Sequence, residues 1–309
     1  MSANLALYYL LRVAAWFVPR VPLRLSYGVA TIAGSCAYYL VPRARRAISA
    51  NLARVLDRPS HGQDVRRAAR RAFQNDAKNW VDTLRIGQAT REDILRSIDI
   101  QGWEHLEEAA AAGKGVIVIG MHLGNYDFVG HYVVLRGHDL VIPVERMVPE
   151  RLFTFLLRLR TSKGIQAVPL DRAPREMLRM LRSGGIVAIM GDRNLAGRGV
   201  EAEFFGAPAT LPRAPLSLAR HSGAPVILAV AARLPSDRFQ GYVSALIPLP
   251  RSRDVEADER EGARRVAAAM EDVIRGHPDQ WLMFTPVWRD GGSVGRPDTI
   301  GQHKEAAVG

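Results

Sequence analysis

The apolar run at residues 116–119 restricts the fold more than any other stretch of this sequence. All of its residues are valine or isoleucine, and β-branched runs of this kind favour a strand that is buried on both faces of a sheet. A short loop with one glycine follows, and it leads to His122 and Asp127 with four residues between them. Because active sites of such sheets collect where strands end, this pair is the first candidate for chemistry.

Apolar runs of strand length alternate with helical patterns from residue 98 onward. The predicted strands are residues 98–100, 116–119, 140–144, 165–168, 186–190, 226–231, 242–249 and a strand-like segment at 281–288. The predicted helices are residues 103–112, 126–135, 150–162, 173–182, 214–221 and 255–275. Thr90 and Asp93 resemble a capping box that opens one more short helix. The alternation predicts the α/β class, with a central mixed β-sheet flanked by helices.

Two apolar helices are predicted before the sheet, at residues 5–18 and 25–41. They would be about 21 and 26 Å long, which is short of the roughly 30 Å hydrocarbon core of a bilayer. Basic residues bracket the second helix: Arg20, Arg24, Arg43, Arg45 and Arg46. Apolar helices beside basic residues suit an anionic bilayer surface, so we predict a monotopic helical anchor on the cytoplasmic face of the cell membrane. Two core helices of a soluble protein, or one true span, are the alternatives.

These patterns divide the chain into three parts. Residues 1–85 form an apolar and basic helical region that we expect to associate with the membrane, and residues 86–290 form the α/β domain. Residues 291–309 are polar and glycine-rich, which predicts a disordered tail.

The net charge of the 309-residue chain is +11, and nearly all of the positive charge is arginine. Such a charge favours phospholipid headgroups, nucleic acid or phosphorylated substrates as partners. An arginine cluster lies at residues 66–71, within a basic helical stretch at 44–84. Few aromatic or polar side chains that could contact bases are interleaved with it, so we predict anionic lipids as its partners and no binding of nucleic acid. The single Cys36 excludes an intramolecular disulfide and indicates a reducing compartment. We find no spacing typical of metal ligands.

A histidine and a carboxylate after a strand can act as a general base and its orienting group. The neutral imidazole takes a proton from an alcohol as that alcohol attacks a carbonyl carbon, and the carboxylate fixes the tautomer. We expect His122 and Asp127 to form this pair, and the backbone N–H groups of Leu123, Gly124 and Asn125 to stabilise the oxyanion at a helix N-terminus. A histidine with a purely structural role is the alternative, and the spacing by itself does not decide between them.

The surroundings of His122 resemble one enzyme family. The segment MHLGNYD at 121–127 is similar to the signature of the glycerolipid and lipid A type acyltransferases, which is His, four residues, then Asp or Glu. The segments GDRN at 191–194, GVEAEFFG at 199–206 and PDQW at 278–281 resemble later blocks of the bacterial lipid A acyltransferases, in the same order. The resemblance covers roughly residues 100–290. It implies the glycerolipid acyltransferase-like fold.

Asp127 and the block Asp192-Arg193-Asn194 look more like the actinobacterial branch of that family, which includes the phosphatidylinositol mannoside acyltransferases. The resemblance implies that His122 is the general base and that Asp127 is its partner. It also implies a set of residues that bind substrate: Gly124, Asn125, Arg160, Arg193, Asn194 and Glu201. The alternatives are a solvated helix position for Arg160, an internal ion pair for Arg193 and a surface strand position for Glu201.

The resemblance implies a membrane-associated O-acyltransferase. It would move a fatty acyl chain from acyl-CoA, or from an acyl carrier protein, to a mannose hydroxyl of a glycolipid acceptor, without a tightly bound cofactor or metal. A lysophospholipid acyltransferase and an acyl thioesterase are the enzymatic alternatives. A membrane-binding protein that retains the fold without catalysis is the alternative outside enzymes.

Overall fold

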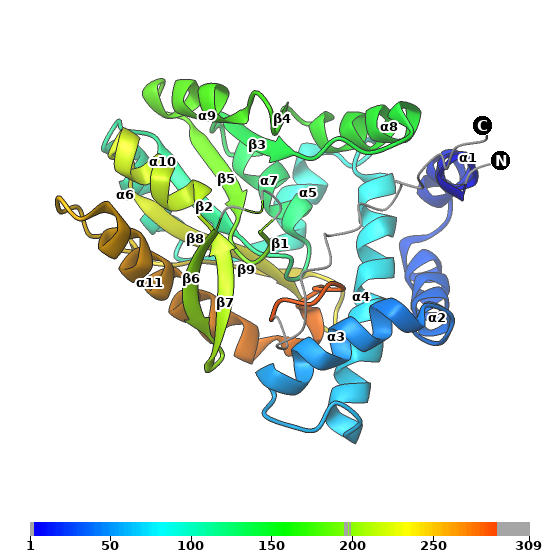
Figure 1. The fold of residues 1–309 in the computed structure, drawn as a ribbon. Helices are drawn as coiled ribbons and strands as arrows, with labels where there is room; N and C mark the ends of the chain where they lie inside the picture. Colours follow the sequence, from blue (N-terminus) through cyan, green and yellow to red (C-terminus); the bar gives the residue numbers. More distant parts are fainter. Residues whose placement is uncertain (1–2, 195–196, 198, 289–309) are drawn as a thin grey trace, which may run out of the picture.

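The computed structural model describes residues 3–194, 197 and 199–288, and these are built around a seven-stranded sheet of order β1-β9-β8-β2-β5-β3-β4 (Figure 1). The strands are β1 Ile98–Gln101, β2 Val116–Gly120, β3 Leu140–Val144, β4 Gln166–Pro169, β5 Ile186–Met190, β8 Val226–Arg233 and β9 Phe239–Val243. Neighbouring strands are parallel except β8 and β9, which are antiparallel. The predicted mixed sheet of an α/β protein is confirmed.

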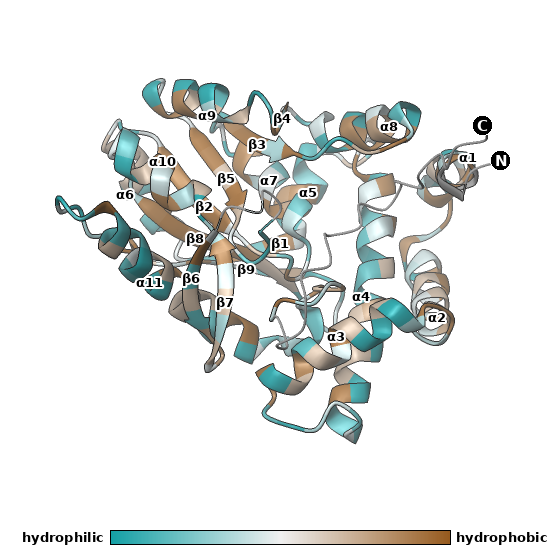
Figure 2. Ribbon diagram, viewed as in Figure 1, coloured by the Kyte–Doolittle hydropathy of each residue, from teal (hydrophilic) through white to brown (hydrophobic). Residues whose placement is uncertain are grey.

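Helices cover both faces of β2, as its β-branched sequence predicts. Val116 and Val118 pack against α6 (Trp103–Ala111) and α7 (Tyr126–Leu135). Ile117 and Ile119 face the opposite way. They belong to a larger core that also includes side chains from three helices: α9 Ala173–Arg182, α10 Ala214–Ser222 and α11 Val255–Gly276. Figure 2 shows the apolar colouring concentrated on these central strands, with hydrophilic colouring along the outer sides of α9 and α11.

The N-terminal helices form a separate layer next to the ends of the strands (Figure 1). They are α1 Ala3–Phe17, α2 Leu23–Leu40, α3 Pro42–Val55 and α4 Gln63–Arg85, with a 3-10 turn at Val18–Arg20. The helical stretch predicted at 44–84 is therefore two helices, separated by a turn that contains Pro59. Among the helices described, none combines the length and hydropathy needed to cross a membrane.

The remaining short elements connect this layer to the sheet. Helix α5 (Arg91–Ser97) opens with the predicted capping box, in which Thr90 and Asp93 bond each other's backbone N–H groups. Helix α8 (Glu150–Thr161) connects β3 to β4 along the chain. A second 3-10 turn, η2, spans Pro278–Gln280.

The structure corrects two strand predictions and adds a hairpin that was not predicted. The strand predicted at 242–249 is β9, which ends at Val243, and Pro248 and Pro250 lie in the irregular segment after it, where proline cannot donate to a ladder. The segment 281–288 makes isolated bridges at Trp281 and Trp288 and is not a strand of the sheet. A separate hairpin of β6 (Gly199–Phe204) and β7 (Ala207–Pro212) was not predicted, although apolar and acidic residues alternate along β6.

The predicted boundary at residue 291 and the tail beyond it lie outside the described residues.

Candidate active site

The loop that follows β2 is held by backbone hydrogen bonds on both sides. The His122 carbonyl accepts from the Leu282 N–H at 2.6 Å, and the Gly124 N–H donates to the Gln280 carbonyl at 2.9 Å. Gly124 has a φ of +59°, and a Cβ at this position would lie 1.8 Å from the carbonyl oxygen of Ala231. Only glycine fits there, so the loop conformation that presents His122 depends on this residue.

The register of the sheet brings His122 next to Asp192. Gly120 at the end of β2 pairs with Met190 at the end of β5, so the residues two positions beyond each strand lie side by side. His122 Nδ1 is 2.8 Å from Asp192 Oδ1, and the His122 backbone N–H donates to Asp192 Oδ2, also at 2.8 Å. This carboxylate therefore holds both the imidazole and its backbone.

Asp192 is 3% exposed and receives a third hydrogen bond, from Trp281 Nε1 at 3.0 Å. Burial opposes ionisation of Asp192, but the attraction of His122 and the hydrogen bonds from His122 and Trp281 outweigh it and keep the pKa of Asp192 below its usual range. An ionised Asp192 favours the tautomer in which Nδ1 carries the proton. Nε2 is then left as the basic nitrogen, as a general base requires.

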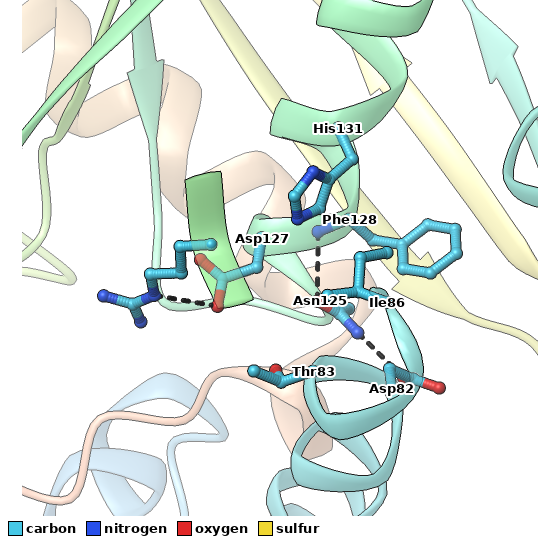
Figure 3. A pocket seen from close by; sticks show the side chains of 8 residues that line it. Asp82, Thr83, Ile86, Asn125, Asp127, Phe128 and His131 are labelled. Carbon is cyan, nitrogen blue, oxygen red and sulfur yellow. Dashed lines mark hydrogen bonds and ion pairs between the residues drawn. The ribbon is translucent and has the colours of Figure 1, made fainter. Parts of the chain in front are cut away.

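The predicted pairing of His122 with Asp127 is wrong. Asp127 Oδ2 instead accepts from Arg160 Nε at 3.2 Å (Figure 3). Successive residues of a helix point about 100° apart. At the start of α7 it is Tyr126 that packs edge-on against the His122 ring, with 5.4 Å between ring centroids, so Asp127 turns toward α8.

Arg160 gives the site a permanent positive charge. The neighbouring Asp127 carboxylate raises the pKa of Arg160 above its usual range. Burial and the same carboxylate raise the pKa of Tyr126 to about 12, so its hydroxyl stays protonated. The sequence predicted Arg160 as a substrate-binding residue. Asp127 and Tyr126 hold it in place, and Tyr126 also packs against the His122 ring.

The oxyanion role predicted for the loop does not fit two of its three N–H groups. The Gly124 N–H is bonded to Gln280, and the Asn125 N–H donates to the carbonyl of Ala231 at 3.0 Å. The side chain of Asn125 caps α7 by accepting from the Phe128 N–H and donates to Asp82 Oδ2 at 2.8 Å. Gly124 and Asn125 therefore shape the loop, and neither backbone donor is open to a ligand.

Comparison with known proteins finds one family over nearly the whole chain. A family model described as bacterial lipid A biosynthesis acyltransferase matches residues 3–290. A phosphatidylinositol mannoside acyltransferase of Mycobacterium tuberculosis is 31% identical over 246 residues, which cover 77% of this chain and 75% of the relative. The chain belongs to the bacterial lipid A biosynthesis acyltransferase family.

Other relatives agree with this assignment. A phosphatidylinositol mannoside acyltransferase of Mycolicibacterium smegmatis is 29% identical over 77% of each chain, and a lipid A biosynthesis lauroyltransferase of Escherichia coli is 23% identical over 86% of each chain. The protein is an acyltransferase, as the sequence resemblance implied.

The other predicted site residues of this acyltransferase differ in placement. Arg193 is exposed and Asn194 half-buried, directly after Asp192, and the Asn194 amide lies against Gly199 of the hairpin. Glu201 is exposed on β6. In the described part of the chain, no hydrogen bond or ion pair joins any of the three to His122, so their roles in binding stay predictions. Asp192 was in the noted block but was not named as a site residue. Its place two residues after a buried strand is the signal that could have identified it.

A small cavity lies beside the Asp127–Arg160 pair (Figure 3). The volume that the centre of a water molecule can occupy in it is about 10 Å³. The cavity therefore has room for about one water molecule. It is lined by Asp82, Thr83, Ile86, Asn125, Asp127, Phe128, His131 and Arg160. His131 is 2% exposed, and its Nδ1 has no hydrogen-bond partner among the described residues.

His131 should make the protein less stable in mild acid. Burial lowers its pKa to about 4, so the unfolded chain binds the proton first as the pH falls from about 6.5. Above pH 6.5, His131 is neutral in both the folded and the unfolded chain and does not lower the free energy of unfolding. Between pH 6.5 and 4, protonation of the unfolded chain at this residue lowers the free energy of unfolding by about 3 kcal/mol. Urea unfolding at several pH values should show a smaller acid dependence for His131→Phe than for wild type. The matched replacement of the exposed His61 should leave the dependence unchanged, and an equal effect of both would contradict the assignment.

Proposed function

We propose that the protein transfers a fatty acyl chain from acyl-CoA to a hydroxyl of a membrane glycolipid, the mannose of a phosphatidylinositol mannoside. The observation that carries the proposal is the bond between His122 Nδ1 and the buried Asp192 carboxylate, which leaves Nε2 as a base in a partly open site. Two relatives at 29–31% identity are named phosphatidylinositol mannoside acyltransferases, which supports the choice of acceptor.

The proposed reaction needs one proton to move twice. Nε2 of His122 takes the proton of the acceptor hydroxyl while its oxygen attacks the thioester carbonyl. The tetrahedral intermediate collapses, the carbon–sulfur bond breaks, and the imidazolium returns the proton to the thiolate of CoA. Asp192 stabilises the imidazolium between these steps. General-base help of this kind is typically worth about 10²–10⁴-fold in rate.

Arg160 fits the binding of a phosphate in either substrate. The Arg160 side chain is one-third exposed, and Asp127 holds the guanidinium through Nε. Guanidinium groups bind phosphate oxygens through several parallel donors. Both acyl-CoA and a phosphatidylinositol lipid carry phosphates, so a fixed arginine close to the base would orient the substrate that reaches it.

The N-terminal layer fits a membrane-facing role. Side chains of α1 and α2 expose apolar surface to solvent: Tyr9, Leu10, Val13, Trp16, Phe17, Leu25, Val29, Ile32, Tyr39 and Leu40. Exposed aliphatic and aromatic groups beside arginines are typical of helices that lie in the interface of an anionic bilayer. We propose that this face docks the enzyme on the cytoplasmic side of the membrane, where an acceptor lipid can reach His122 without exposing its chains to water.

Acyl transfer from labelled palmitoyl-CoA tests the function. Purified protein would be assayed with a phosphatidylinositol mannoside, with a lysophospholipid and with no acceptor. We expect label on the mannoside. The rate of transfer should be at least about 10²-fold lower with His122→Ala. The control variant His221→Ala, which changes an exposed histidine, should transfer at the wild-type rate. Label on the lysophospholipid alone would mean that the acceptor is a lysophospholipid and not the mannoside. Free fatty acid alone would indicate a thioesterase. A His122→Ala protein as fast as wild type would contradict the role of the base.

A further inference from the structure

Trp281 contacts both members of the His122–Asp192 pair, although it belongs to neither of the strands that carry them. Its indole Nε1 donates to Asp192 Oδ2 at 3.0 Å, and its backbone bridges to Leu123, the residue after His122. The next residue, Leu282, donates its N–H to the His122 carbonyl at 2.6 Å. One short segment therefore holds the loop that follows β2 and also the carboxylate that follows β5.

The Asp192 carboxylate uses both of its oxygens in this arrangement. Oδ1 faces His122 Nδ1, while Oδ2 accepts from the His122 backbone N–H and from the Trp281 indole. Rotation of the carboxylate about its bond to the methylene group would carry Oδ1 away from Nδ1. Two donors in fixed positions on Oδ2 oppose this rotation, and a hydrogen bond to a buried charge is stronger than one between neutral groups.

The indole of Trp281 is buried in an aromatic cluster and has little freedom to move. Trp281 is 0% exposed, and its ring centroid lies 6.0 Å from that of Phe204, 6.4 Å from that of Phe205 and 6.1 Å from that of Trp288. Both phenylalanines come from the tip of hairpin β6–β7. On the other side, Asn51 of α3 donates to two backbone carbonyls of the segment that follows α11 (Figure 1).

A second tryptophan of this cluster has the same chemistry but a different hydrogen-bond partner. Trp288 is 9% exposed, packs against the same two phenylalanines and donates from Nε1 to the Phe204 carbonyl at 2.9 Å. Its hydrogen bond therefore ends on the hairpin backbone, whereas that of Trp281 ends on the carboxylate beside His122. The two residues allow the effect of packing to be separated from an effect on the base.

We propose that Trp281 is a positioning residue for acyl transfer, because its indole N–H fixes the Asp192 carboxylate in the rotation that presents Oδ1 to His122. The inference rests on the proposed role of His122 as the general base. Positive charge develops on the imidazole only as the acceptor hydroxyl loses its proton. A carboxylate that turns away therefore weakens stabilisation of the transition state and leaves the binding of both substrates unchanged.

Steady-state kinetics of Trp281→Phe test this role, with labelled palmitoyl-CoA and a phosphatidylinositol mannoside. The variant keeps an aromatic ring and removes the N–H. Loss of a hydrogen bond to a charged group should lower kcat about 10- to 100-fold, while each KM should change less than about twofold. Trp288→Phe is the matched control. It also loses an indole N–H from the same cluster, and its kcat should stay within about twofold of wild type.

Trp281→His separates the N–H donor from the packing of the ring. In both side chains a ring nitrogen lies two bonds from Cγ, so the imidazole Nε2 can take the place of the indole Nε1 and donate. An imidazole is smaller and more polar than a phenyl ring, so packing alone predicts a lower melting temperature and a lower kcat than for Trp281→Phe. A positioning role predicts the opposite order of kcat, with Trp281→His closer to wild type.

Two further measurements report on the His122–Asp192 contact itself. In NMR spectra the hydrogen-bonded Nδ1 proton of His122 should shift or disappear in Trp281→Phe and persist in Trp288→Phe. In an Asp192→Asn background, Trp281→Phe should lower kcat by less than about threefold, because the carboxylate through which it acts has already been removed. Fully additive losses would mean that Trp281 acts by another route, and would overturn the proposal.

The possible failures are distinguishable. If His122→Ala and Asp192→Asn lower kcat and Trp281→Phe does not, the positioning role alone is wrong. Equal losses of kcat in Trp281→Phe and Trp288→Phe would also reject it, because they would indicate general damage to the aromatic cluster. A His122→Ala protein as fast as wild type would instead reject the general base, and the role of Trp281 with it.

Discussion

Asp192→Asn should lower the rate constant of acyl transfer by about 10²–10⁴-fold without unfolding the protein. The amide keeps the shape of the side chain but cannot neutralise the imidazolium that forms when His122 takes the hydroxyl proton. Its NH₂ group can also donate to Nδ1, which would stabilise the wrong tautomer. Both effects act on the chemical step, so we expect kcat to fall much more than either KM changes.

Asp127→Asn is the matched comparison, because it changes the carboxylate that the sequence spacing selects. It removes the charge that holds Arg160 and leaves the contact between His122 and Asp192 in place. We expect its main effect on the KM of the substrate whose phosphate Arg160 binds. The two variants can also be told apart by NMR: the hydrogen-bonded Nδ1 proton of His122 should persist in Asp127→Asn and shift or disappear in Asp192→Asn. The reverse pattern would show that Asp127 is the orienting carboxylate.

Local sequence pattern was sufficient to place His122 but not its partner. The valine and isoleucine runs at β2 and β5 identify buried strands because few other structures suit such residues, and the polar residue after each strand is a natural site candidate. The pairing of those two residues depends on β2 and β5 being neighbours in register. Strand order is a long-range property, and seventy residues separate the pair along the chain.

Sequence spacing also gave a wrong partner for His122, because the geometry of helix α7 decides where the Asp127 side chain points. Asp127 lies near His122 in the chain, yet the helix that begins at Tyr126 turns its carboxylate away and places the tyrosine ring against the imidazole. The segment 281–288 gave a similar difficulty. Its apolar and aromatic residues predicted a strand, whereas Trp281 is buried because its indole donates to Asp192 and its backbone bridges to Leu123. Composition alone cannot separate a strand from a segment that supports an active-site loop.

Arg233→Met should lower the free energy of unfolding by about 3–5 kcal/mol, because it leaves a buried carboxylate without its cation. Arg233 is 6% exposed at the end of β8 and pairs with Asp82 of α4, which is 7% exposed. The same Asp82 carboxylate accepts hydrogen bonds from Tyr27 of α2 and from Asn125 of the catalytic loop. Removal of the guanidinium therefore affects the sheet, two N-terminal helices and the loop together.

The double variant Asp82→Leu/Arg233→Met separates stability from catalysis. Replacing both charges with apolar groups removes the uncompensated carboxylate, so urea unfolding should show much of the lost stability restored, and a double-mutant cycle should give a large coupling energy. Strictly additive losses would mean that the two charges do not act as a pair. The double variant still lacks the acceptor for the Asn125 side chain, and Asn125 and Gly124 hold the loop that presents His122. We therefore expect a folded enzyme with a lower kcat, because the network that joins the N-terminal helices to the sheet also positions the general base.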